Sequence, residues 1–342
     1  LFDAAAGFGG YRESGFGREG GREGLAEYLT PLAKQGKVAE AAPAKLSALP
    51  AFDGPHEISG LPTIDRTAKL YIGGRQMRPD SGYSYSVLNK AGHAVGQAGL
   101  GNRKDIRNAV EAAGKAASWG GATAHNRAQI LYFVAENLSA RATEFEARLA
   151  ALTGAPAEAA AAEVGLAIRR AFYYAAQADK FDGAVHATKT RHVTLAMNEP
   201  FGTLGIVAPD KAPLLGFVSL VMPAIAMGNC VVAIPSQSHP LAATDFYQIL
   251  DTSDVPAGVV NIVTGDSEAL AKVLAEHDDV AALWYFGTKA GSAMVEKASI
   301  GNLKTVWANH GVQRRWGDAS CQGREFLRRA TQVKNIWVPY GE

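Results

Sequence analysis

A glycine-containing segment near the C-terminal end is one candidate for phosphate binding. Gly287-Thr288-Lys289-Ala290-Gly291 follows an apolar predicted strand and opens a predicted helix. Backbone N–H groups at such a helix start, together with the helix dipole, favour a bound phosphate. The spacing matches neither G-x-G-x-x-G nor the Walker sequence, so an ordinary strand-to-helix turn is the alternative.

Two other residues extend this candidate cofactor site. Ser236 follows another predicted strand, where its hydroxyl would either bind a ribose or phosphate or cap the next helix, and capping is the simpler interpretation. Gly265 follows the next predicted strand. We assign no residue to catalysis and none to a metal.

The two cysteines are poor candidates for chemistry. Cys230 and Cys321 are too few and too far apart for a disulfide framework or a zinc cluster. Cys230 begins a predicted buried strand, where a small apolar thiol packs well. This cysteine usage fits a reducing, cytoplasmic location.

The overall charge excludes two classes of partner. The 342 residues carry 34 Lys and Arg against 33 Asp and Glu, a formal net charge of +1. Without a basic field, nucleic acid and anionic membranes are not expected as main partners. The run from Ala212 to Ser238 carries no charge, but Pro213, Pro223 and Pro235 interrupt it. We expect a buried helix followed by a central strand there, not a membrane span.

The elements that must position these residues alternate regularly in the C-terminal half. The pattern predicts an α/β fold with a Rossmann-like, doubly wound parallel sheet, whose ligands bind at the carboxyl ends of the strands. The predicted strands are Thr203–Ala208, Cys230–Ile234, Val259–Val263, Val280–Phe286 and Leu303–Trp307. The predicted helices between them are Leu214–Met227, Leu241–Leu250, Ser267–Glu276 and Lys289–Ala298.

The N-terminal half divides by composition. Residues 1–30 contain eight glycines in their first 24 positions, and residues 31–66 are rich in Ala, Pro and Lys, which is typical of a linker. A hairpin at Lys69–Arg78 is predicted to follow, then a strand and N-terminal helices, and Val185–Met197 alternates like an extended ribbon. The predicted helices are Asn102–Ser118, Ala124–Leu152 and Ala157–Lys180.

Several motifs occur in a familiar order along the chain. They are Leu70-Tyr71-Ile72-Gly73-Gly74, Glu199-Pro200-Phe201-Gly202, Met222 to Asn229, Val231-Val232, Pro235-Ser236, Val255 to Asn261 and Asn302-Leu303-Lys304. In this order they resemble the N-terminal portion and the nicotinamide-binding half of an aldehyde dehydrogenase. The resemblance implies a chemistry in which a cysteine attacks an aldehyde, an asparagine holds the oxyanion and a glutamate activates water.

This sequence departs from the family at each catalytic position. Lys211 stands where the family has the oxyanion asparagine, and a solvated loop lysine is a simpler interpretation than a Schiff-base nucleophile. Asn309 stands where the family has the water-activating glutamate, and Ile234 and Gln237 replace the residues that grip the adenosine ribose. Only 31 residues follow Gly311, fewer than a second domain with its own core requires. We therefore expect the catalytic domain to be largely missing.

Two copies of one short motif suggest how the chain is organised. Ser14 to Glu19 and Ser320 to Glu325 share S-x-x-G-R-E, and each resembles the C-terminal tail of the family, which places Cys321 opposite Gly15. The resemblance implies the tail of an upstream module at 1–30, a linker at 31–66 and a second, degenerate module at 67–342. An oligomerisation ribbon would comprise 183–199 and 330–340.

The resemblance implies a non-catalytic assembly module. It would dock, as a second subunit would, on an active module that oxidises an aldehyde to a carboxylic acid with NAD. The expected partner is that upstream module or another subunit, and a homo-oligomer is expected. We expect no cofactor in this segment, and NAD if any. One alternative is an NAD-binding sensory pseudoenzyme, which would hold the dinucleotide through vestigial contacts to Ser236, Gly265, Gly287 and Thr288. The other is an active NAD-dependent aldehyde dehydrogenase.

Overall fold

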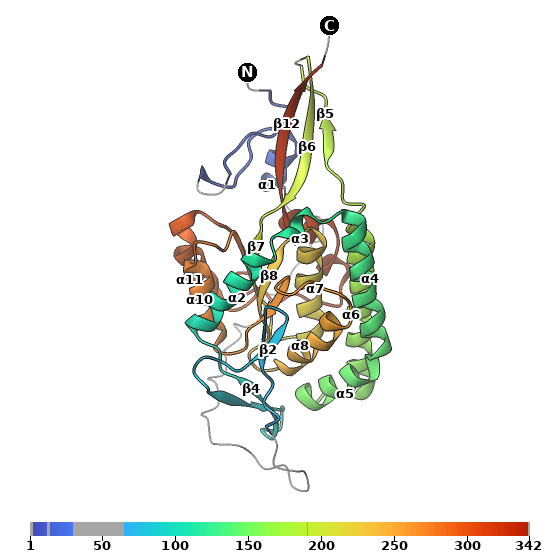
Figure 1. Cartoon of the computed structure of the whole chain (residues 1–342), viewed down its shortest axis with the longest axis vertical. Helices are drawn as coiled ribbons and strands as arrows, with labels where there is room; N and C mark the ends of the chain where they lie inside the picture. Colours follow the sequence, from blue (N-terminus) through green and yellow to red (C-terminus); the bar gives the residue numbers. More distant parts are fainter. Residues whose placement is uncertain (1–2, 12–13, 30–64, 190, 341–342) are drawn as a thin grey trace.

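A central sheet organises the main body of the protein. The computed structural model describes residues 3–11, 14–29, 65–189 and 191–340 (Figure 1). The strands of this sheet are β1 (Leu70–Ile72), β2 (Arg75–Met77), β7 (Thr203–Val207), β8 (Cys230–Ile234), β9 (Val260–Ile262), β10 (Ala282–Tyr285) and β11 (Thr305–Ala308). Their spatial order is β11-β10-β7-β8-β9-β1-β2, in which β11 to β9 run parallel and β1 pairs antiparallel with β9 and β2.

The middle strands and their connecting helix are fully buried, as the charge-free run predicts. Every residue of β7, β8 and α7 (Pro213–Ala226) is buried. Continuous apolar strands of this kind are typical of parallel sheets covered on both faces. Among the residues that the structure describes, no helix is long and apolar enough to span a membrane.

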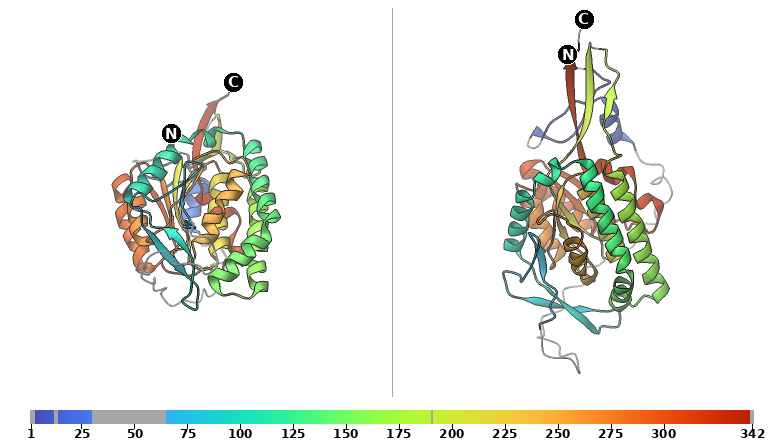
Figure 2. Two further views of the ribbon diagram at one scale, coloured as in Figure 1. Left: turned by 60° about the horizontal axis from the view of Figure 1, so that its bottom comes forward. Right: turned by 45° about the vertical axis from the view of Figure 1, so that its right-hand side comes forward.

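Helices cover both faces of the sheet, which confirms the doubly wound prediction (Figures 1 and 2). One face carries α2 (Arg103–Lys115), α10 (Ser267–Glu276) and α11 (Lys289–Ala298). The other face carries α7, against which α4 (Ala124–Ala140) and α6 (Ala157–Gln177) pack. Two short helices, α3 (Ser118–Gly121) and α12 (Arg324–Arg329), complete the body.

Three local predictions were wrong. The predicted helix Ala124–Leu152 is divided at Arg141 into α4 and α5 (Ala142–Thr153), because the φ and ψ of Arg141 are −108° and 19°. The predicted helix Leu241–Leu250 forms α8 (Leu241–Asp245) and α9 (Tyr247–Asp251). A strand absent from the prediction, β4 (Ala94–Gly99), pairs with β3 (Ser84–Leu88), and its glycines weaken the strand signal.

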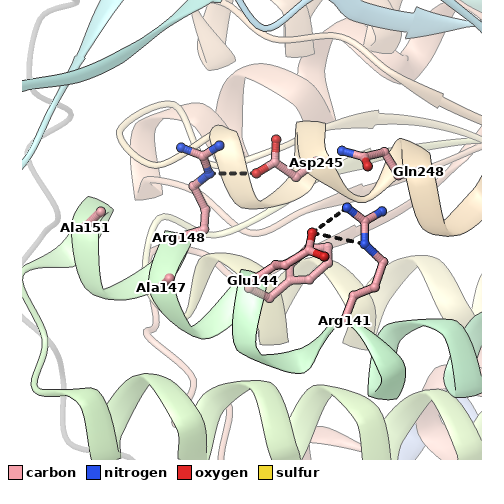
Figure 3. A pocket seen from close by; sticks show the side chains of 8 residues that line it. Arg141, Glu144, Ala147, Arg148, Ala151, Asp245 and Gln248 are labelled. Carbon is pink, nitrogen blue, oxygen red and sulfur yellow. Dashed lines mark hydrogen bonds and ion pairs between the residues drawn. The ribbon is translucent and has the colours of Figure 1, made fainter. Parts of the chain in front are cut away.

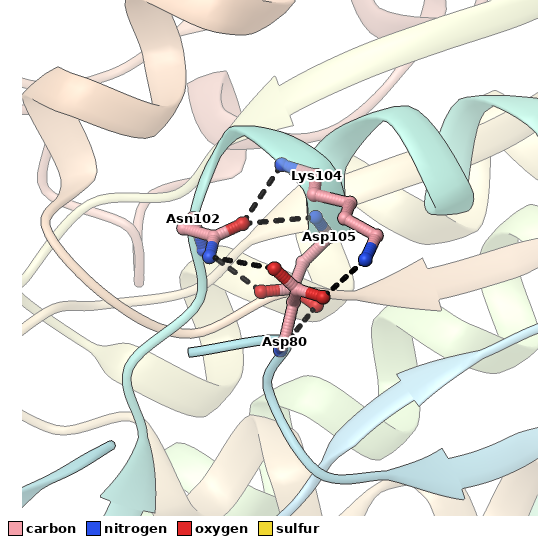
Figure 4. A network of polar contacts seen from close by, with 4 residues as sticks. All are labelled: Asp80, Asn102, Lys104 and Asp105. Carbon is pink, nitrogen blue, oxygen red and sulfur yellow. Dashed lines mark hydrogen bonds and ion pairs between the residues drawn. The ribbon is translucent and has the colours of Figure 1, made fainter. Parts of the chain in front are cut away.

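The start of α2 is fixed by a capping box (Figure 4). Asn102 Oδ1 accepts hydrogen bonds from the amides of Lys104 (2.8 Å) and Asp105 (3.3 Å). Asp105 in turn accepts from the amide of Asn102 at 2.9 Å and from that of Asp80 at 3.0 Å. This reciprocal arrangement satisfies amides that an isolated helix end leaves unpaired.

A three-stranded ribbon projects from the body (Figure 1). Its strands are β5 (Ala184–His186), β6 (His192–Pro200) and β12 (Thr331–Pro339), in the order β12-β6-β5. β12 pairs antiparallel with β6 along its whole length, from Thr331 opposite Pro200 to Pro339 opposite His192. The chain beside the ribbon includes α1 (Gly21–Tyr28), so segments about 300 positions apart in sequence lie together (Figures 1 and 2).

Candidate functional site

The residues predicted to bind a cofactor lie around the point where the strand order reverses. From β7 the chain proceeds to β8 and β9 on one side, whereas β10 and β11 lie on the other. Asp210 follows β7, Tyr285 ends β10 and Thr288 caps α11. Ligands of open α/β sheets bind at this kind of switch point.

The side chain of Tyr285 fills this point. Its hydroxyl accepts a hydrogen bond from the amide of Thr288 at 3.3 Å. A Cβ atom built on Gly287 or Gly291 would overlap that hydroxyl, so the phenol lies directly against the glycine turn. Burial raises the pKa of Tyr285, and the nearby carboxylates of Glu268 and Asp210 add to the shift. A neutral phenol thus occupies the start of α11.

The predicted phosphate turn is capped by side chains of the same chain. Thr288 Oγ1 accepts from the amide of Gly291 at 2.9 Å and donates to Glu268 Oε1 at 2.7 Å. A carboxylate therefore already lies beside this helix start, where an anion is favoured. A phosphate would have to approach against the charge of Glu268.

Ser236 does not cap the next helix, contrary to the simpler interpretation, because α8 begins after Pro240 without a side-chain cap and Ser236 lies in the turn before it. Its hydroxyl donates to Asp210 Oδ1 at 2.7 Å and accepts from the amide of His239 at 2.9 Å. Gln237 Oε1 accepts from the amide of Ser267 at 2.8 Å, at the start of α10. Gly265 has a φ of +148° and would meet Gly101 if it carried a Cβ atom, so it is fixed by close packing. The structure brings Ser236 and Thr288 to the switch point, with both hydroxyls engaged.

The two positions where catalytic family residues are expected also lack the required groups. Lys211 is exposed, and next to it Glu163 Oε1 accepts from the amides of Leu214 (3.0 Å) and Leu215 (3.1 Å) at the start of α7. Burial raises the pKa of Glu163. Asn309 donates from its side-chain amide to the carbonyl of Val312 at 3.1 Å. The side chains of Glu163 and Asn309 thus bind backbone groups, and neither is placed as a base beside a nucleophile.

Both cysteines are buried and protonated. Cys230 donates to the carbonyl of Ala116 at 3.3 Å, and burial raises its pKa to about 12. Cys321 donates to the carbonyl of Arg315 at 3.3 Å, and burial raises its pKa despite the opposing effect of nearby arginines. Neither is a thiolate near neutral pH, which a nucleophilic cysteine must be. Within the described ranges, no three His, Cys, Asp or Glu side chains are grouped to hold a metal.

An aromatic cluster closes the sheet where the chain leaves β11. The guanidinium carbon of Arg314 lies 5.1 Å from the ring centre of Trp307, 5.5 Å from that of Phe286 and 5.6 Å from that of Phe326. Glu325 pairs with Arg314 at 3.8 Å. Stacking of a cation on ring faces in a buried setting is favourable. The segment after β11 therefore forms a cover for the core.

Two cavities lie away from the switch point. One of about 340 Å³ lies between α5 and the α8–α9 segment, where Arg141 pairs with Glu144 and Arg148 Nε pairs with Asp245 Oδ2 at 2.6 Å (Figure 3). The other, of about 520 Å³, adjoins the start of α2 and the end of α10. Both are lined by charges of both signs, and neither contains a residue predicted to bind a cofactor.

A second candidate site is the ribbon, on which the N-terminal segment lies (Figures 1 and 2). Arg18 donates from Nε and Nη2 to the carbonyl of Val333, at 3.1 Å and 2.9 Å. His186 Nε2 lies 3.1 Å from Glu23 Oε1, and both side chains are nearly buried. Sequence reasoning missed these contacts. Four others join the segment to the module: Asn335 to Gly7, Asp3 to Lys189, Tyr11 to Glu199 and Glu27 to Arg328.

Several large apolar side chains of the N-terminal segment are exposed. The exposed fractions are 62% for Phe8, 54% for Phe16, 56% for Leu25 and 87% for Tyr28.

Comparison with known proteins gives consistent matches. The model of the aldehyde dehydrogenase family matches residues 77–316. Mouse cytosolic 10-formyltetrahydrofolate dehydrogenase is 31% identical over 254 residues, which cover 71% of this chain and 28% of that protein. Mitochondrial benzaldehyde dehydrogenase of Antirrhinum majus is 32% identical over 244 residues, which cover 70% of this chain and 46% of that protein.

The solved structures agree with these matches. A putative aldehyde dehydrogenase from Burkholderia cenocepacia is similar with a TM-score of 0.68 and 30% identity, over 71% of this chain and 50% of that one. The chain thus spans half or less of the length of these relatives.

Proposed function

Because the chain belongs to the aldehyde dehydrogenase family, we propose that it serves as a non-catalytic assembly module. It docks through its ribbon on an active aldehyde dehydrogenase module, in the way that a second subunit would. The active module, not this one, carries out the NAD-linked oxidation of an aldehyde to a carboxylic acid.

One observation carries this proposal: the segment that resembles the tail of another module is bound to the ribbon. Its contacts include the paired hydrogen bonds of Arg18 with Val333 and the buried pair Glu23–His186. A ribbon with an open edge is suited to such docking, because unpaired backbone N–H and C=O groups of an edge strand can form hydrogen bonds with another polypeptide. The exposed apolar side chains of the segment are then available to contact the rest of the upstream module.

The switch point supports a role without turnover. The residues there do not fit a dinucleotide, because Tyr285 covers the glycine turn and Glu268 lies beside the helix start. The hydroxyl of Thr288 is already used in capping α11, and that of Ser236 is bonded to Asp210 and to the amide of His239. The buried cysteines offer no nucleophile.

Docking is tested with the chain and an active aldehyde dehydrogenase module expressed as a separate polypeptide. We expect one complex by size-exclusion chromatography with light scattering. Deletion of 183–197 is expected to abolish the complex while the circular dichroism of the body persists. A complex that survives the deletion contradicts docking through the ribbon.

Cofactor binding and turnover are tested on the chain alone. We expect no saturable heat on titration with NAD⁺ or NADH to millimolar concentration, and no aldehyde-dependent formation of NADH. One-to-one binding in the micromolar range, about 8 kcal/mol, indicates a dinucleotide sensor instead. Formation of NADH indicates an active enzyme and contradicts the proposal.

A further inference from the structure

We propose that the ribbon, contacted at both of its edge strands, β12 and β5, is a binding site for a polypeptide of the pattern S-x-x-G-R-E-x-G-x-E, occupied in this chain by residues 3–29. In the sequence this pattern runs from Ser14 to Glu23. The inference rests on the proposed function, and it names the part of the partner that the ribbon recognises.

Arg18 binds the β12 edge of the ribbon. β12 is the outer strand, and the carbonyl of Val333 accepts both Nε and Nη2 of Arg18. The third nitrogen of the same guanidinium donates to the carbonyl of Gly10 at 2.6 Å, so one side chain both shapes the segment and attaches it. A lysine cannot reproduce this planar fork of donors.

Glu23 contacts the other edge strand of the ribbon, β5, through His186. Their side chains are 12% and 6% exposed, so this contact is largely shielded from water. The second carboxylate oxygen of Glu23 lies against Gly7 and Gly21, and a Cβ atom on Gly21 would overlap it. Recognition therefore requires both the glutamate and a glycine two positions before it.

The second S-x-x-G-R-E of the chain lacks both features. Counting from its Ser320, the positions equivalent to Gly21 and Glu23 are Leu327 and Arg329. In the structure its Arg324 lies over the ring of Phe181, 5.7 Å from the centre, and makes no use of the ribbon edge. The site thus distinguishes two motifs that are alike in their first six residues.

On the ribbon, the segment is folded back on itself. The amide of Phe8 donates to the carbonyl of Glu19 at 2.7 Å, and the amide of Glu19 donates to the carbonyl of Phe8 at 2.6 Å. These bonds close the loop that contains Arg18.

The test uses the full chain with a specific protease site introduced within residues 30–64. After cleavage, we expect the N-terminal fragment to co-elute with the rest of the protein. A fluorescent peptide of residues 1–29 is expected to exchange into the site and to be displaced by unlabelled peptide. A peptide of residues 317–329, which carries the second motif, is expected not to compete.

Matched variants separate recognition from general charge. Arg18→Gln in the peptide is expected to weaken binding at least tenfold, whereas Arg22→Gln, at an exposed position of the same segment, is expected to change it less than twofold. Glu23→Ala and His186→Ala are each expected to weaken binding, and the double change is expected to weaken it no more than either alone.

The proposal is overturned if the cleaved fragment elutes separately from a protein that keeps its circular dichroism and melting temperature. It is also overturned if Arg18→Gln and Arg22→Gln have equal effects. A retained fragment together with a failure to dock on an active module leaves the peptide site standing and contradicts only the proposed function.

Discussion

The hydroxyl of Tyr285 accepts a hydrogen bond from the amide of Thr288, so the last residue of β10 is bonded to the N-cap residue of the helix that follows it. In a dinucleotide-binding sheet that amide is available to the ligand. Here one aromatic side chain fills the space, satisfies the amide and belongs to the buried core, with 1% of its surface exposed. The side chain of Tyr285 thus makes the switch point part of the buried core.

Tyr285→Ala is expected to lower the free energy of unfolding by about 3–5 kcal/mol, because it removes a buried aromatic side chain and leaves a cavity. Urea titration followed by circular dichroism measures the change. Tyr340→Ala, at a residue that is 64% exposed, is the control and is expected to cost less than about 0.5 kcal/mol. Equal effects of the two changes contradict the packing role of Tyr285.

Both thiols are expected to resist modification in the native protein. With a pKa of about 12, only about one Cys230 in ten thousand is a thiolate at pH 8. Ellman's reagent is expected to release no thionitrobenzoate within minutes under native conditions, and two equivalents in guanidinium chloride. Rapid native reaction of one thiol shows that it is accessible and ionised, contrary to its burial.

Lys304 is expected to make stability depend on pH in the alkaline range. Its Nζ donates to the carbonyls of Leu274, Ala275 and His277, but burial lowers its pKa from 10.5 to about 8. Between these values the unfolded chain binds more protons at Lys304 than the folded one, so stability contributed by this residue rises with pH.

The measurement compares the parent chain with Lys304→Met at pH 7 and pH 9.5. The difference in free energy of unfolding is expected to move in favour of the parent by about 2 kcal/mol over this interval. Lys297→Met, at an exposed position in the last turn of α11, is expected to show no such trend. A difference that is constant with pH shows that the pKa of Lys304 is not lowered.

Asn102→Ala is expected to destabilise the protein by about 1 kcal/mol, because the amides of Lys104 and Asp105 lose their acceptor. Arg103→Ala, at the first residue of the same helix, leaves the cap intact and is expected to be nearly neutral. Thermal melting of both variants measures the loss of stability. A larger loss for Arg103→Ala than for Asn102→Ala would contradict the role of the cap.

The sequence by itself determined the family, the fold class and most element positions. Periodicity located α7, β8, α10 and α11 within a residue or so, because apolar residues repeat with the spacing of a helix or fill a buried strand. It failed at Arg141 and Phe246, where helices break without glycine or proline, and at β4, because local preference is weak beside tertiary packing.

Only the tertiary structure decided what the candidate site contains. The spacing of Gly287, Thr288 and Gly291 is compatible with a phosphate, and no local rule reveals that Tyr285 and Glu268 lie over them. The same holds for Arg18 and Val333, which are 315 positions apart. Sequence patterns record what neighbours along the chain prefer, whereas contacts between distant segments depend on how the whole chain packs, and in this protein those contacts determine the sites.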